Sequence, residues 1–174
     1  MADTRSTRDG QPVTGTIIHL GAGRARALAE YLAQNPRQIV LVEADPARSR
    51  ELERLAADYE QVEVIAAAAT AGDGTATLRC FNVKDLNSLA APTTVRELLP
   101  GLRQVDTVEV DTIALDTLFQ RENLETGQGN RLVIETSGSE PALVDALCES
   151  EALSRFDRID LHCGREPLFE GGAP

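Results

Sequence analysis

A glycine turn and one carboxylate are the strongest indication of a ligand site in this sequence. The turn is Gly21-Ala22-Gly23, after an apolar run that ends at His19-Leu20, and Glu43 comes 22 residues after Gly21. Glycines let a backbone approach a ligand closely, and a helix that begins after such a turn offers unpaired N–H groups. A carboxylate at this spacing can accept hydrogen bonds from both hydroxyls of a ribose. The pair predicts a site for an adenosine-containing ligand; a turn that needs glycine only for its geometry is the alternative.

Two further carboxylates, Glu135 and Glu140, come at and after the end of a predicted strand over residues 131–136. Both fall near the edge of the sheet where ligands bind in parallel α/β folds, and Glu135 is the candidate functional residue of the two. A solvated acid at the end of a strand is the alternative. Glu140 falls in the first turn of a helix opened by Pro141, where the helix dipole favours a carboxylate. We therefore assign Glu140 a structural role.

The elements that must position these residues are predicted from hydrophobic periodicity and from helix start signals. Short apolar segments predict buried strands at residues 16–20, 38–43, 62–66, 131–136 and 158–162. Helical spacing and Pro-containing starts predict helices at 24–33, from Asp45-Pro46 onward and from Pro141 onward. Strands that alternate with helices predict a Rossmann-like α/β fold, a doubly wound and mostly parallel sheet. In such a sheet, ligands bind beyond the carboxyl ends of the strands.

The middle of the chain departs from this alternation. Residues 75–81 and 105–110 alternate between apolar and polar side chains, which predicts an inserted antiparallel β-hairpin. Residues 82–100 have only weak helical periodicity and predict a long excursion over the edge of the sheet or over a site. We divide the chain into a flexible lead-in (1–14), one domain (15–164) and a flexible tail (165–174).

Composition excludes several classes of function. The net charge of −11 repels phosphate backbones and anionic membrane surfaces, and aromatic residues are only 3% of the chain, too few for stacking single-stranded nucleic acid. Three cysteines and two histidines at wide spacings form no disulfide framework and no zinc site. No segment is long and apolar enough to span a membrane, and the N-terminus has no signal-peptide pattern. We expect a cytoplasmic protein that binds no nucleic acid and does not insert into membranes.

Over residues 16–163 the sequence resembles the FkbM-type methyltransferases, S-adenosylmethionine-dependent enzymes that mostly O-methylate sugars and other natural products. The resemblance lies in the order and spacing of the segments IIHLGAG, LVEADP, VEVIAAAATAGDGTATL, VEVDTIALDTL and LVIETSGSEPAL. It implies a class I methyltransferase fold with S-adenosylmethionine as the cofactor. It places the glycine turn under the methionine portion of the cofactor, Glu43 at its ribose and Ala67 or Ala68 near its adenine. The cofactor-binding residues that it implies are His19, Gly21, Ala22, Gly23, Glu43, Ala67 and Ala68.

The sequence differs from the family pattern at residues that would position the cofactor's amino group and the acceptor. His19 stands in place of the leading acid and Ala25 in place of the third turn glycine. Val133, Glu135 and Ser137 stand in place of a lysine, an aspartate and a glutamate. The sequence also stops soon after its fifth predicted strand, where a full methyltransferase sheet has two more. We therefore expect a sheet that lacks its last two strands.

Three functional hypotheses remain open. The first is an S-adenosylmethionine-dependent O-methyltransferase, in which Glu135 assists deprotonation of a small-molecule acceptor. The second is a non-catalytic scaffold, which would cover the exposed edge strand near residues 158–163 with a second copy or another protein. The third is a nucleotide-dependent oxidoreductase. It is the least favoured, because Arg26 stands where a dinucleotide-binding turn has its third glycine.

Overall fold

A five-stranded parallel sheet forms the centre of the molecule. The computed structural model describes residues 15–164 and 166–172. The sheet has the order β3-β2-β1-β7-β8, and all of its neighbouring strands are parallel. Its strands are β1 (Thr16–Leu20), β2 (Gln38–Val42), β3 (Val62–Ile65), β7 (Arg131–Ile134) and β8 (Arg158–Leu161). The strand order reverses direction between β1 and β7, so the ends of these two strands form the switch point where ligands bind in open α/β sheets.

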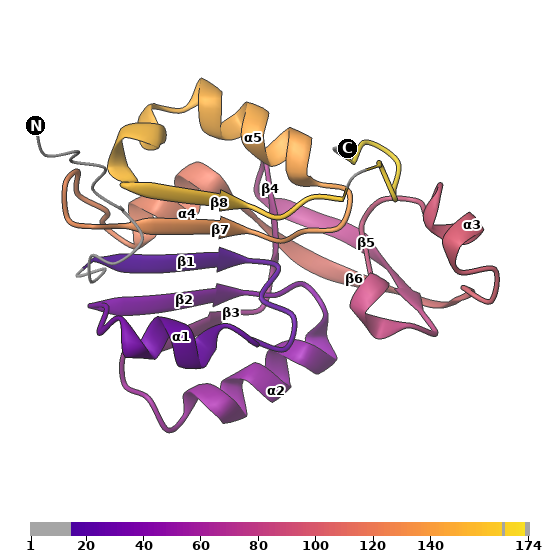
Figure 1. Ribbon diagram of the computed structural model, residues 1–174, viewed down its shortest axis with the longest axis horizontal. Helices are drawn as coiled ribbons and strands as arrows, with labels where there is room; N and C mark the ends of the chain where they lie inside the picture. Colours follow the sequence, from indigo (N-terminus) through magenta and orange to yellow (C-terminus); the bar gives the residue numbers. More distant parts are fainter. Residues whose placement is uncertain (1–14, 165, 173–174) are drawn as a thin grey trace, which may run out of the picture.

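Helices cover both faces of this sheet (Figure 1). The apolar side chains of α1 (Leu28–Ala33) and α2 (Pro46–Ala56) pack against one face, and those of α4 (Leu115–Arg121) and α5 (Glu140–Glu149) pack against the other. A five-residue 3₁₀ turn, η2 (Glu151–Arg155), follows α5. This two-sided packing explains why the central strands are continuous apolar runs rather than alternating ones. The predicted doubly wound α/β fold is confirmed.

Two of the three predicted helix starts agree with the structure and one differs. The helix expected from Pro141 begins one residue earlier, at Glu140. Asp45 caps α2 by accepting a 2.8 Å hydrogen bond from the Ala47 N–H, and Pro46 is the first helical residue, as predicted. The helix predicted from Arg24 begins only at Leu28. The intervening turn contains Gly23 and Ala25 in left-handed conformations, with φ of 57° and 47°. A left-handed residue cannot continue a right-handed helix, and Ala25 gives no local sign of this conformation.

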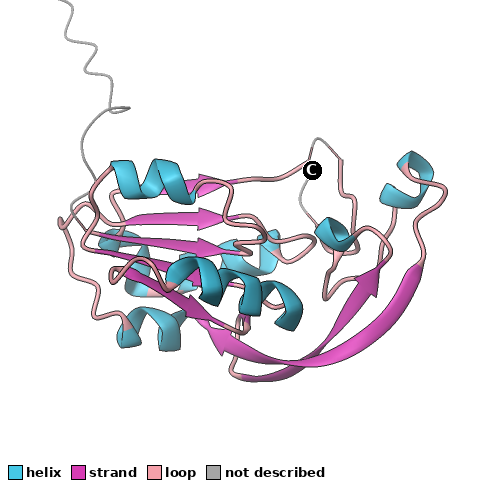
Figure 2. Ribbon diagram, turned by 90° about the horizontal axis from the view of Figure 1, so that it is seen from below, coloured by secondary structure: helices cyan, strands magenta, loops and turns pink. Residues whose placement is uncertain are grey.

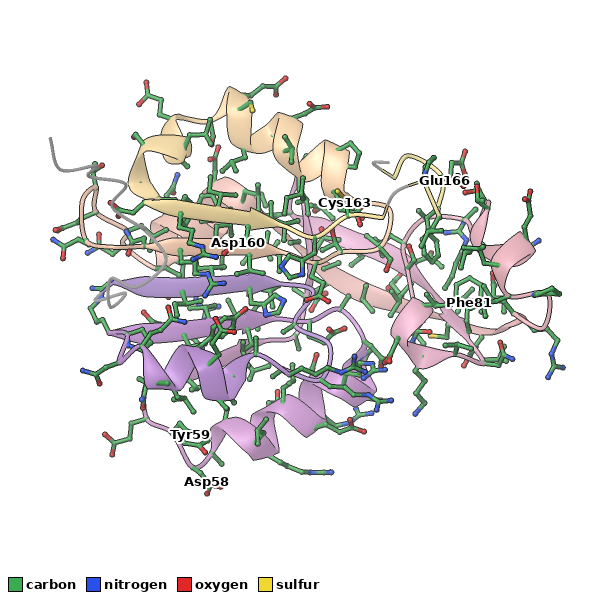
Figure 3. All side chains as sticks on the ribbon, viewed as in Figure 1. Asp58, Tyr59, Phe81, Asp160, Cys163 and Glu166 are labelled. Carbon is green, nitrogen blue, oxygen red and sulfur yellow. The ribbon has the colours of Figure 1, made fainter. Side chains whose placement is uncertain are left out.

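Apolar residues at helical spacing in and just after α2 are only partly buried. Leu52 and Ala56 pack in the core, but Leu55 is 42% exposed and Tyr59 is 37% exposed. Tyr59 lies beyond the end of α2 at the margin of the molecule (Figure 3). Leu52 therefore contacts the strands, whereas Leu55 and Tyr59 lie outside the buried stripe.

A second sheet lies beyond the carboxyl ends of the parallel strands (Figure 2). It has the order β4-β6-β5 and contains β4 (Ala68–Thr70), β5 (Gly74–Phe81) and β6 (Gln104–Ala114). The antiparallel pairing of β5 with β6 confirms the predicted hairpin. The parallel pairing of β4 with β6 was not predicted, because three residues are too few to give a periodic signal.

The connection between β5 and β6 packs against residues near the C-terminus. It contains a 3₁₀ turn, η1 (Lys84–Leu86), and a one-turn helix, α3 (Val95–Leu98). Phe169 is 3% exposed and packs with Phe81, Val95 and Leu102. Residues 166–172, which we expected to belong to a flexible tail, are therefore held by an apolar cluster. The predicted lead-in over residues 1–14 lies outside the described residues.

Candidate functional site

A cavity of about 240 Å³ lies at the switch point of the parallel sheet. It is lined by the turn after β1, the end of β2, residues 67–69, residues 84, 85 and 87–89 of the long connection, and the residues that follow β7. Its size is near the lower end of the roughly 300–1,000 Å³ typical of ligand pockets. The predicted excursion of residues 82–100 therefore lies over a site, because five of its residues form one wall.

Gly21 and Gly23 both have left-handed backbone conformations, but they differ in the space available for a side chain. Gly21 has a φ of 76°, and a Cβ there would lie 2.3 Å from the Glu135 carbonyl oxygen. Gly21 therefore lets the turn after β1 contact the backbone after β7. A Cβ on Gly23, whose φ is 57°, would have the Gly21 carbonyl oxygen as its nearest neighbour at 3.9 Å. Gly23 lines the cavity, so the space beside it is available to a ligand.

Glu43 is buried at the end of β2 and held by two backbone donors. Its Oε2 accepts a 2.7 Å hydrogen bond from the Gly23 N–H, and its Oε1 accepts a 2.8 Å hydrogen bond from the Asp45 N–H. Burial raises the pKa of Glu43, and the two N–H donors oppose that rise. A carboxylate oxygen can accept two hydrogen bonds, so each oxygen retains capacity for a ligand hydroxyl.

Apolar residues form the wall of the cavity beyond Glu43. Ala67, Ala68 and Ala69 are each 5–6% exposed, and Leu78 of β5 is 3% exposed. Small apolar side chains at this place leave room for the ring of a bound ligand and can contact its face. Ala67 and Ala68, which the family resemblance places near adenine, thus line the same cavity as Glu43 and the glycine turn.

His19 does not line the cavity. It is 3% exposed, with its Nδ1 3.2 Å from the Tyr31 hydroxyl and its Nε2 3.3 Å from Glu135 Oε2, off the line of a full hydrogen bond. Burial raises the pKa of Tyr31 to about 12, so its hydroxyl keeps its proton and can donate to His19 Nδ1. The remaining ring N–H of His19 then faces Glu135. The structure therefore places His19 behind the candidate base rather than against a ligand.

Glu135 lies between both histidines of the chain. His162 Nδ1 is 3.8 Å from the same Oε2 that His19 approaches. The His19 imidazole lowers the pKa of Glu135, against the opposing effect of partial burial. Sequence reasoning missed His162, although it directly follows the strand that pairs with the one preceding Glu135. Leu161 is in register with Ile134, which places the next residues, His162 and Glu135, side by side.

A second cavity, of about 150 Å³, adjoins the first and shares residues 135–137 with it. His162, Glu140 and Phe169 also line it. Glu140 Oε2 accepts a 2.9 Å hydrogen bond from the Gly138 N–H, which agrees with the structural role assigned from the sequence. Figure 3 labels Cys163 just beyond β8 and Glu166 in the C-terminal segment that completes this region. Glu135 thus faces two adjoining spaces.

The comparisons with known proteins identify the fold. A scan against protein-family models finds no match, and no curated protein matches the sequence. The crystal structure of the methyltransferase FkbM from Methylobacillus flagellatus KT superposes with a TM-score of 0.52 at 12% sequence identity. The chain has a methyltransferase fold. The match covers 83% of this chain and 32% of that one, so the chain spans about a third of that enzyme's length.

The superposition supports the resemblance found in the sequence at the level of the fold. The order β3-β2-β1-β7-β8 is the parallel part of a methyltransferase-like sheet, and the described residues contain no strand on the outer side of β8. Across residues 15–164 and 166–172, no group of three or more His, Cys, Asp or Glu side chains is arranged to hold a metal ion. The same part of the chain contains no helix long and apolar enough to cross a membrane.

Proposed function

We propose that this chain binds S-adenosylmethionine in the larger cavity and transfers its methyl group to a hydroxyl of a small molecule in the adjoining cavity. The observation that carries the proposal is Glu43, a buried carboxylate at the end of β2 with both oxygens fixed by backbone N–H groups. Its remaining acceptor capacity faces a cavity that Ala67, Ala68, Ala69 and Leu78 also line. A ribose with an attached purine requires this combination.

The proposed roles of the chain's own residues follow from their positions. Bound S-adenosylmethionine supplies an electrophilic methyl group. Glu135 lies where the two cavities meet and would receive the acceptor's hydroxyl proton on a carboxylate oxygen, while the acceptor oxygen replaces sulfur on the methyl carbon and S-adenosylhomocysteine is the leaving group. His19 and His162 would hold that carboxylate in place. Alignment of the two bound molecules across residues 135–137 would provide much of the rate.

Replacing Glu43 with alanine is expected to weaken binding of S-adenosylhomocysteine by about 100-fold or more. The change removes two hydrogen bonds between a charged group and the ribose hydroxyls, each contributing roughly 1.5 kcal/mol or more. Calorimetric titration measures the effect. Glu53→Ala is the matched control, because Glu53 is exposed on α2 and its loss changes the net charge equally. Equal affinity in wild type and Glu43→Ala would contradict the assignment of the ribose site.

Binding of S-adenosylhomocysteine is also expected to weaken as the pH falls. The loss should begin at a higher pH than it would if Glu43 had the ordinary pKa of a glutamate. Burial raises the pKa of Glu43, so this carboxyl becomes protonated earlier as the pH falls. The protonated acid then loses acceptor capacity toward the ribose. Titrations from pH 7.5 down to about pH 4.5 would show the loss. Affinity in Glu43→Ala should vary much less over this range, and parallel curves for the two proteins would refute the prediction.

A non-catalytic partner-binding module is the second candidate. The observation that favours it is β8, which lies at the edge of the sheet with Ile159 and Leu161 38% and 41% exposed. An exposed edge strand with apolar side chains is a common site of pairing with another chain. The calorimetric experiment separates the candidates, because a module that retains only the fold would show no binding at millimolar S-adenosylhomocysteine.

A further inference from the structure

Three arginines converge on one aspartate at the mouth of the larger cavity. Arg24 and Arg26 belong to the turn after β1, Arg48 belongs to α2, and Asp85 belongs to η1. Arg24 Nε lies 3.5 Å from Asp85 Oδ1, Arg26 Nη2 lies 3.3 Å from Oδ2, and Arg48 forms an ion pair with Oδ1. Segments far apart in the sequence therefore place their guanidinium groups around one point on the cavity wall.

The charges at this point do not balance. One carboxylate faces three guanidinium groups, and Lys84, the only lysine in the chain, lines the same cavity. The whole chain carries a net charge of −11, so this concentration of positive charge is opposite in sign to the protein around it. Glu43, Asp45 and Glu135 also line the cavity, so the surplus of positive charge is confined to the group around Asp85. A local surplus of this kind attracts an anion to the point where the guanidinium groups meet.

The Asp85 carboxylate is suited to exchange with an anion from solution. The side chain of Asp85 is 48% exposed, that of Arg24 is 59% exposed and that of Arg26 is 78% exposed. Ion pairs between exposed side chains are weak. The Arg48 side chain is only 6% exposed, so it supplies a fixed guanidinium at the base of the cluster. The position of the turn that carries Asp85 does not depend on this carboxylate. Asn87 holds the turn in place by donating a hydrogen bond to Asp45 and accepting one from the Phe81 N–H.

We propose that Arg24, Arg26, Arg48 and Lys84 bind a phosphoryl group of a small molecule in this cavity, and that Asp85 occupies their site in its absence. A carboxylate has two oxygens and one charge, which a single guanidinium group can pair with. A phosphate dianion has more oxygens and twice the charge, so it can form hydrogen bonds with several guanidinium groups. S-adenosylmethionine carries no phosphate. The site therefore goes beyond the proposed function, and its affinity for phosphate is measured without S-adenosylmethionine.

The test is calorimetric titration with inorganic phosphate at constant ionic strength. Asp85→Asn is expected to bind phosphate about tenfold more tightly than wild type, since it removes the competing carboxylate and its three ion pairs. Arg26→Gln, at an exposed position, is expected to weaken binding in the Asp85→Asn background, as is Arg48→Gln. Arg50→Gln is the matched control, because Arg50 is exposed on α2 and does not line the cavity. If Asp85→Asn binds phosphate no better than wild type, the cluster only anchors the long connection and the proposal is wrong.

Two phosphorylated probes then distinguish the source of the phosphoryl group. Adenosine 5′-diphosphate that binds more tightly than phosphate and depends on Glu43 indicates a nucleotide in the larger cavity. Glucose 6-phosphate that binds more tightly than phosphate and is unaffected by Glu43→Ala indicates a phosphorylated acceptor. Either result supports the site. Binding of both probes at the same strength in the Asp85→Asn protein and in its Arg26→Gln and Arg48→Gln derivatives would overturn it.

Discussion

Gly21→Ala is expected to destabilise the protein by about 3 kcal/mol or more, because the added methyl has no room and the backbone conformation opposes it. The Cβ would lie 2.3 Å from the Glu135 carbonyl oxygen and 2.9 Å from its carbonyl carbon, and both are backbone atoms. The Gly21 and Ala22 N–H groups also donate to the Val42 carbonyl oxygen, so the turn cannot move without loosening β2. Urea denaturation of both proteins measures the difference.

Gly23→Ala is the matched control for this prediction. Gly23 is also left-handed, but a Cβ there would be 3.9 Å from its nearest neighbour, the Gly21 carbonyl oxygen. The substitution should therefore cost only the roughly 1–2 kcal/mol of the left-handed conformation. Because Gly23 lines the cavity, the same variant should weaken S-adenosylhomocysteine binding. Equal destabilisation by the two substitutions would show that the contact with Glu135 is not the cause.

Glu135→Gln is expected to lower the rate of methyl transfer by about 10²- to 10⁴-fold, the contribution typical of a general base. The amide keeps the shape of the side chain but cannot accept the acceptor's proton. Because His19 lowers the pKa of Glu135, the wild-type carboxylate stays ionised to a lower pH than an ordinary glutamate. The Glu135-dependent part of the rate should therefore persist below the usual glutamate range and be absent from the variant.

The measurement is transfer of a labelled methyl group to the hydroxyl-bearing acceptors that wild type methylates, with S-adenosylhomocysteine affinity measured alongside. Affinity should change little, since Glu43 and the alanine wall are untouched. A variant with full activity would exclude Glu135 as the base and leave His162, 3.8 Å away in the second cavity, as the group to replace next. Loss of affinity together with activity would indicate a role in shaping the cavity instead.

The two histidines beside Glu135, the candidate base, could be found only from the folded structure. His19, Glu135 and His162 are far apart in the sequence and meet because β1, β7 and β8 are adjacent and parallel. Adjacency of strands depends on how the crossover helices pack, and no local pattern encodes it. For the same reason, the ion pairs between the three arginines and Asp85 could not be predicted from the sequence. They connect the turn after β1, helix α2 and the long connection.

Local patterns determined the elements themselves. Apolar runs buried on both faces located the strands of the parallel sheet, Asp45-Pro46 located the start of α2, and the spacing from Gly21 to Glu43 located the cavity. These signals are reliable because each reflects the chemistry of one strand, one cap or one turn. Tertiary structure alone decided the left-handed Ala25, the pairing of β4 with β6 and the burial of Phe169. Each of these depends on contacts between distant segments, whose free energy appears only when the chain is folded.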